Sequence, residues 1–141
     1  MASNIIKIKR SKAFTLIELL VVVAIISILS TVILFSVSQY ISRGKDASVV
    51  GNLAILVAAG EVYYDYNAVT PNSYEGFCGS SVVQNSLSQI ISGNKHCFAS
   101  INAWAACARL FIDPDKAYCV DSRGVKKEIL NSDCKDMTVC P

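Results

Sequence analysis

The apolar and charged positions divide the chain into a long apolar run near the N-terminus and a mixed C-terminal part. Residues 19–42 are 24 consecutive positions without a charged side chain. An α-helix rises about 1.5 Å per residue, so this run spans about 36 Å, enough to cross a hydrocarbon core of about 30 Å. It is too long for the apolar core of a secretory signal, and no small-residue cleavage site follows it closely. The pattern therefore predicts a retained membrane-spanning helix.

The helical pattern continues beyond the apolar run. No Pro occurs before Pro71, and residues 43–66 have apolar side chains at roughly helical spacing. We therefore expect one helix from Phe14 to about Tyr66, 53 residues long and about 80 Å in length. Its outer half should lay an apolar face on a C-terminal domain. The aromatic cluster at the end of this helix is expected to pack under a sheet: Tyr63, Tyr64 and Tyr66.

The C-terminal part alternates short apolar segments with turn signals. We expect, in chain order, a short amphipathic helix at residues 81–92 ended by Gly93, an apolar segment at 98–112, a turn at 113–116, a strand at 117–121, a turn at 122–124 and a third strand at 125–130. The flanks of the first turn should form a hairpin. The predicted fold class is therefore α+β, with a long N-terminal helix packed on a small antiparallel sheet.

Charge is distributed unevenly along the chain. Four of the 13 Lys and Arg residues, and none of the 11 acidic residues, stand within the first 13 positions. Basic residues flanking a span stay on the cytoplasmic side, so the N-terminus is expected inside and the C-terminal part outside. The remaining residues have 9 basic and 11 acidic side chains, a balance of −2. No strongly basic patch is visible, so charge does not support general nucleic-acid binding.

All six cysteines follow the predicted span, on its outer side. An even number of cysteines in a small extracytoplasmic domain predicts a disulfide framework. No two are closely spaced, which disfavours the alternative of a zinc site. We expect Cys78 to pair with Cys97, Cys134 with Cys140, and Cys107 with Cys119 across the hairpin.

Candidate catalytic and metal-binding residues are few. His96 is the only histidine and precedes Cys97, but adjacent strand residues point to opposite faces and are poorly placed to share a proton. Calcium is an alternative for four acidic residues, although the first two fit a hairpin turn more simply: Asp113, Asp115, Asp121 and Asp133. No Gly-rich phosphate loop or paired-carboxylate motif is present. We expect a non-enzyme that needs no cofactor.

The residues around the start of the apolar run, AFTLIELLVVVAIISIL, include one acid, Glu18, at the edge of the span. A charged side chain at this position is energetically costly, so a functional role or a partner for Glu18 is expected. This segment resembles the N-terminal signature of type IV pilins and pseudopilins. The resemblance implies cleavage between Ala13 and Phe14 by a prepilin peptidase and N-methylation of Phe14. It makes Glu18 the fifth mature residue, paired with the Phe14 amine of a neighbouring subunit. The alternative is that the Glu18 carboxylate lies at head-group level and is solvated. Ala13 stands where the family usually has Gly.

The resemblance also implies an organisation and a set of partners. The expected parts are a leader at residues 1–13, a membrane and filament-core helix at 14–42, the outer half of that helix at 43–66, and a disulfide-containing head at 67–141. The implied partners are the prepilin peptidase, other pilin subunits, and the assembly platform and ATPase machinery. The subunit should wait in the cytoplasmic membrane as a single-pass protein and then enter a surface pilus or a periplasmic filament.

Three other functions stay open. A pseudopilin of a type II secretion system would have the same N-terminal signal. A membrane-anchored binding module would have the span and the head without the processing. An anchored enzyme is disfavoured because no catalytic constellation is recognisable.

Overall fold

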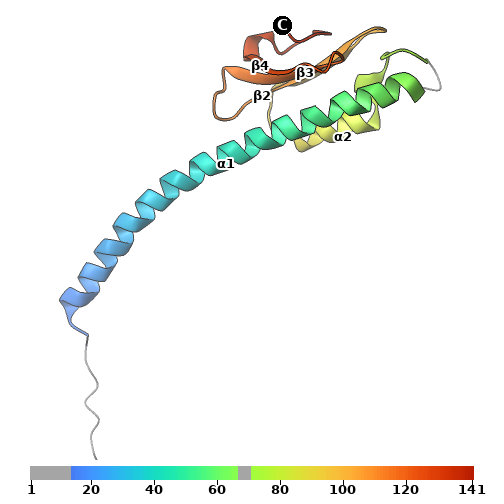
Figure 1. The fold of residues 1–141 in the computed structure, drawn as a ribbon. Helices are drawn as coiled ribbons and strands as arrows, with labels where there is room; N and C mark the ends of the chain where they lie inside the picture. Colours follow the sequence, from blue (N-terminus) through green and yellow to red (C-terminus); the bar gives the residue numbers. More distant parts are fainter. Residues whose placement is uncertain (1–13, 67–70) are drawn as a thin grey trace, which may run out of the picture. The chain divides into compact units, whose positions relative to one another are not determined.

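The computed structural model describes residues 14–66 and 71–141, and the expected leader at residues 1–13 lies outside the described residues. The chain divides into two compact units, one ending at Val37 and one formed by Ser38–Pro141. Helix α1, Leu16–Tyr66, contributes to both units and has 51 residues (Figure 1). We describe the two units separately.

The first unit consists of the N-terminal part of α1. Its large apolar side chains between Leu16 and Leu34 are all 46–82% exposed, so none is covered by the rest of the chain. By length and composition, α1 is able to cross a membrane: its most apolar 18-residue window has a mean hydropathy of 2.9. Polar groups in such a span must find partners within the protein. The hydroxyls of Ser27, Ser30 and Ser36 do so by donating to carbonyls one turn earlier, those of Val23, Ile26 and Val32.

The second unit combines the outer half of α1 with a small sheet and a second helix. Its elements are η1 (Phe77–Gly79), α2 (Ser81–Gln89), β1 (Lys95–Ala99), β2 (Trp104–Arg109), β3 (Lys116–Asp121), β4 (Lys126–Leu130) and η2 (Asn131–Asp133). The strands form one antiparallel sheet in the order β1-β2-β3-β4. Figure 1 shows the sheet lying over α1, with α2 beside the helix. The predicted α+β class, a long helix with a small antiparallel sheet, is confirmed.

The central part of the sheet contributes to two cores, one on each face, because successive strand residues point to opposite sides. On one face, Trp104, Ala106 and Ala108 of β2 form a core with α1 and α2. The α1 residues of that core are Val49, Leu53 and Leu56, spaced to lie on one side of a helix. On the other face, Cys107 and Cys119 form a second core with residues of the C-terminal segment. Strand β2 is therefore buried on both sides.

This double burial explains why the strands were only partly predicted. A strand with both faces covered has no alternation of apolar and polar residues, so β2 looks like part of one apolar segment at 98–112, which only Ser100 and Asn102 interrupt before the strand. The structure divides that stretch between β1 and β2, with a tight turn in which the Ser100 amide donates to the Ala103 carbonyl at 2.8 Å. The sheet consequently has four strands instead of the expected three. Helix α2 also ends at Gln89, short of Gly93.

The aromatic cluster at the end of α1 is partly as predicted. Tyr63 packs on Phe77 with ring centroids 5.3 Å apart, and Tyr64 packs on Tyr74 at 4.8 Å. Tyr66 does not take part, because its side chain is 81% exposed. The cluster packs against η1 and the loop before it, and through Phe77 it reaches Trp104 of the sheet.

Three disulfides hold the head together. Cys78 pairs with Cys97 as predicted, but Cys107 pairs with Cys134 and Cys119 with Cys140. The predicted pairs Cys107–Cys119 and Cys134–Cys140 are therefore wrong. Cys107 and Cys119 are indeed register partners across the hairpin, but the C-terminal segment lies over the face they share. Each strand cysteine takes a partner from that segment instead.

Candidate functional site

The candidate site at the N-terminus is built around the first turn of α1. The Thr15 amide and the Thr15 hydroxyl both donate to Glu18 Oε2, at 2.9 and 2.7 Å. In return, the Glu18 amide donates to Thr15 Oγ1 at 3.3 Å. This reciprocal pair is a capping box, in which a hydroxyl and a carboxylate satisfy amides that a helix start leaves unpaired. The carboxylate also lies at the positive end of the helix dipole.

The capping box gives Glu18 a role within its own chain. Among the described residues, its side-chain hydrogen bonds go to Oε2 alone, which leaves Oε1 available to a second donor. The nitrogen of Phe14 is still a peptide nitrogen in the uncleaved chain, so the amine implied by the family resemblance does not yet exist. The Phe14 side chain is 75% exposed beside this turn. Ala13, the other residue of the expected cleavage site, lies outside the described residues.

A second cluster of charge lies in the head, where Asp121 joins three segments of the chain. Its buried carboxylate accepts hydrogen bonds from Arg123 Nε and Nη2 at 3.0 and 2.6 Å. It also accepts from the amides of Arg123, Val125 and Cys140 at 3.0–3.2 Å. Arg123 Nη2 donates in addition to the Cys140 carbonyl at 3.2 Å. We call this group the Asp121 clamp.

The Asp121 clamp has a structural role. Burial acts to raise the pKa of Asp121, but the Arg123 guanidinium and the amides of Cys140, Arg123 and Val125 together outweigh it, and the pKa is lowered. Asp121 is therefore a carboxylate at neutral pH with its oxygens occupied by protein donors. It fixes the last residues of the chain against the turn between β3 and β4, next to the Cys119–Cys140 disulfide.

The other chemical candidates are not brought together. The His96 side chain is exposed on β1, and Cys97 is held in a disulfide. Of the possible calcium ligands, Asp113 accepts from the Asp115 amide at 3.2 Å within the hairpin turn, and Asp121 is in the clamp. Within residues 14–66 and 71–141, no group of three or more His, Cys, Asp or Glu side chains is placed to hold a metal ion.

The capping box and the Asp121 clamp were not predicted from the sequence. Thr15 and Glu18 follow the pattern Thr-x-x-Glu ahead of an apolar run, which is a local signal for a capping box. This local pattern is sufficient to predict the capping box, whereas the family resemblance concerns Glu18 alone. The Asp121 clamp had no such signal, because the Cys140 amide comes from a segment 19 residues further along the chain.

Comparison with known proteins identifies the N-terminal segment. Residues 8–34 match the family model of the prokaryotic N-terminal methylation motif, the prepilin signal of type IV pilins and pseudopilins. The match contains Ala13, Phe14, Thr15 and Glu18 and covers the first turns of α1. No curated protein and no solved structure matches the chain. The signal implies processing by a prepilin peptidase and assembly with other pilin subunits.

Proposed function

We propose that this protein is a structural subunit of a type IV pilus or a related filament. A prepilin peptidase cleaves it between Ala13 and Phe14, and Phe14 is then N-methylated. The observation that carries the proposal is the prepilin signal at residues 8–34, which stands directly on the first turn of an apolar helix long enough to span a membrane. The head contributes a covering domain and no catalysis.

The geometry at Glu18 supports a two-stage role for this carboxylate. While the subunit waits in the membrane, Thr15 satisfies Oε2 and so lowers the cost of a charge at the edge of an apolar span. After cleavage, the new Phe14 amine of a neighbouring subunit is a cation that can donate a hydrogen bond to Oε1. An ion pair among apolar side chains is favourable when both charges are well matched and hydrogen-bonded. Such a pair sets the axial register of one subunit against the next.

The exposed apolar surface of α1 supports assembly through this helix. Apolar side chains remain uncovered on all sides between Leu16 and Leu34. In the membrane, lipid covers them, and in a filament the same segments of other subunits replace the lipid. The head stays on the outer side, where the environment allows its three disulfides to persist. The assembly platform and its ATPase machinery are the partners that extraction from the membrane requires.

The proposal is tested by following incorporation into filaments. Cells producing the wild-type chain, Glu18→Ala or Asp65→Ala are sheared, and the chain is measured in the sheared fraction and in the membrane. Asp65→Ala is the matched control, because it removes an exposed carboxylate from the opposite end of the same helix. We expect Glu18→Ala to reach the membrane normally and to be depleted from the filaments, with Asp65→Ala unchanged. Normal incorporation of Glu18→Ala contradicts the proposed role.

The same fractions distinguish the other functions. A secretion pseudopilin is recovered from the cell envelope and not from sheared surface fibres. An anchored binding module keeps its leader and stays in the membrane in every variant.

A further inference from the structure

A pocket of about 430 Å³ lies in the second unit, at the place where α1 leaves the apolar run. It is lined by Ser38, Gln39, Ser42 and Arg43 of α1 and by Phe111 and Ile112 of the connection between β2 and β3. The α1 residues form two pairs at i and i+4, which project from the same side of a helix. One wall therefore has hydroxyl, amide and guanidinium groups, and the opposite wall is apolar. The volume falls in the range of small-ligand pockets, about 300–1,000 Å³.

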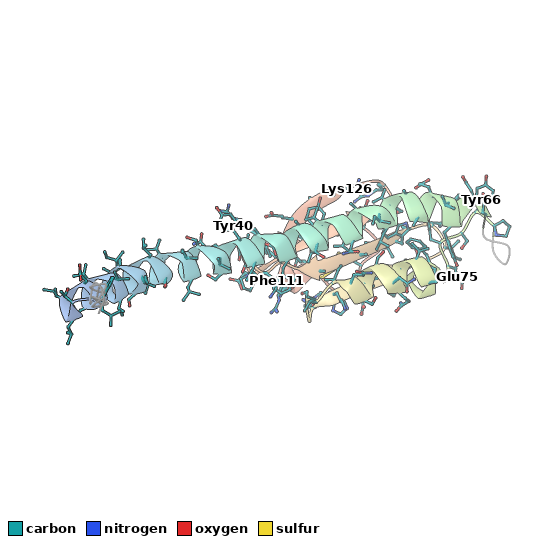
Figure 2. All side chains as sticks on the ribbon, turned by 90° about the horizontal axis from the view of Figure 1, so that it is seen from below. Tyr40, Tyr66, Glu75, Phe111 and Lys126 are labelled. Carbon is teal, nitrogen blue, oxygen red and sulfur yellow. A yellow bond between two sulfur atoms is a disulfide. The ribbon has the colours of Figure 1, made fainter. Side chains whose placement is uncertain are left out.

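The apolar wall is fixed in place by Asp46. Its carboxylate accepts hydrogen bonds from the amides of Phe111 and Ile112 at 2.6 and 3.2 Å. The Lys45 ammonium lies 5.0 Å from the centre of the Phe111 ring, within cation–π distance. Figure 2 shows Phe111 beside α1, at the end of the head away from Tyr66 and Glu75. The connection is thus attached to the helix one turn beyond Arg43.

Charge at the pocket favours an anion. Arg43 makes no ion pair with any residue that the structure describes, and Lys45, which lies over the Phe111 ring, is not among the residues that line the pocket. Asp46 is the acid nearest to them in the sequence, and both of its oxygens already accept hydrogen bonds from the backbone. A guanidinium binds a phosphate through two parallel hydrogen bonds. The Gln39 amide, one turn before Arg43, offers a further donor.

The position of the pocket identifies the source of the phosphate. Residues 19–42 have no charged side chain, and Arg43 is the first charge after them. A run of about 36 Å places Arg43 just beyond a hydrocarbon core of about 30 Å, which is the level of the lipid head groups. Tyr40, three residues before Arg43 on α1, is 70% exposed, and Ile112 in the pocket wall is 58% exposed. Tyrosine is enriched at this membrane interface.

We propose that the pocket binds the phosphate of a glycerophospholipid in the outer leaflet while the subunit waits in the membrane. Arg43 and Gln39 hold the phosphate, and Phe111 and Ile112 contact the glycerol and the first acyl carbons. The inference rests on the proposed function, because it requires the membrane-inserted state and the outward orientation of the head.

The test measures lipid retention by the full-length chain in a non-ionic detergent. Native mass spectrometry counts bound phosphatidylglycerol and, separately, diacylglycerol with the same acyl chains and no phosphate. The variants are Arg43→Gln and the matched control Lys126→Gln, which removes one exposed cation from β4 (Figure 2). Trp104 emission checks that each variant is folded.

We expect phosphatidylglycerol to be retained by the wild type and by Lys126→Gln. Its retention should fall about tenfold or more in Arg43→Gln, as the loss of hydrogen bonds to a charged group implies. Equal retention by Arg43→Gln, or equal retention of diacylglycerol, overturns the inference. If Arg43→Gln retains lipid but is lost from sheared filaments, Arg43 contacts another subunit and the inference is also wrong. Cleavage before Phe14, measured in the same strains, tests the proposed function separately.

Discussion

Gly60 of α1 provides the most quantitative test of how the head packs on the helix. A Cβ atom built on Gly60 would lie 2.6 Å from Trp104 Nε1 and 2.9 Å from two carbons of the same ring. Contacts below 3.0 Å cannot be accommodated without movement. The Trp104 side chain is fully buried and packs on Phe77 with ring centroids 4.8 Å apart, so the indole cannot easily move away from an added methyl group. Gly60 therefore permits the close approach of α1 to the sheet.

The expected magnitude follows from two opposing effects. Replacing Gly by Ala in a helix gains about 1 kcal/mol of helix propensity. Overpacking a tight core costs about 1–3 kcal/mol, and three contacts below 3.0 Å with a buried ring place Gly60→Ala at the upper end. We expect Gly60→Ala to lower the free energy of unfolding by about 2 kcal/mol.

Gly51 is the matched control within the same helix. No atom lies within 4 Å of a Cβ built there, so the added methyl group causes no clash. The higher helix propensity of Ala should then raise the free energy of unfolding of Gly51→Ala by about 0.5–1 kcal/mol. The two variants should differ by about 3 kcal/mol although the chemical change is identical.

The assay is urea unfolding of the full-length chain in non-ionic detergent with its disulfides intact. Trp104 is the only tryptophan, so its fluorescence reports on the interface being tested. Equal stability of Gly60→Ala and Gly51→Ala would contradict this prediction, because the close approach of α1 to Trp104 would then have no energetic consequence.

Three further predictions concern the clamp, a disulfide and the capping box. Asp121→Asn should lower the free energy of unfolding by about 2–4 kcal/mol at pH 7, since Asn cannot accept all the bonds that the carboxylate accepts. The pKa of Asp121 is lowered by folding, so the contribution of its charge is complete above the unfolded-state pKa of about 4. That contribution is lost as the pH falls through the lower folded-state pKa. Urea unfolding between pH 7 and pH 2 should therefore show a fall in the free energy of unfolding of the wild type, and a smaller fall for Asp121→Asn. The double variant Cys119→Ala, Cys140→Ala opens a loop of 21 residues and should cost about 3 kcal/mol, and an unchanged unfolding midpoint contradicts this. Thr15→Val should increase hydrogen exchange at the Glu18 amide several-fold, as loss of a cap worth about 1 kcal/mol implies, whereas Thr15→Ser should preserve protection; equal exchange in both variants excludes the capping box.

The features that could be predicted from sequence depend on residues close together in the chain. A long uncharged run and helical spacing of apolar residues were enough to predict α1, and Pro, Gly and Asp residues marked the turns at residues 113–116 and 122–124. The N-terminal signal is likewise local, with its chemistry contained between Ala13 and Glu18. Each of these patterns results from the backbone geometry of a few consecutive residues.

The features that could not be predicted depend on contacts between distant segments. Strand β2 loses its alternation because α1 covers one face and the C-terminal segment covers the other. The same segment supplies the partners of Cys107 and Cys119, so spacing along the hairpin pointed to the wrong pairs. The pocket beside Arg43 exists because Asp46 binds amides 65 and 66 residues away. No pattern of neighbouring residues predicts these contacts.

We propose that the chain is a prepilin whose apolar helix is retained after cleavage. Intact mass spectrometry of the protein from its native membrane and from a sheared surface fraction tests it most directly. We expect a chain that begins at Phe14, is heavier by one methyl group and is lighter by the six hydrogens lost in forming three disulfides. A full-length chain that begins at Met1 or Ala2 in both fractions contradicts it.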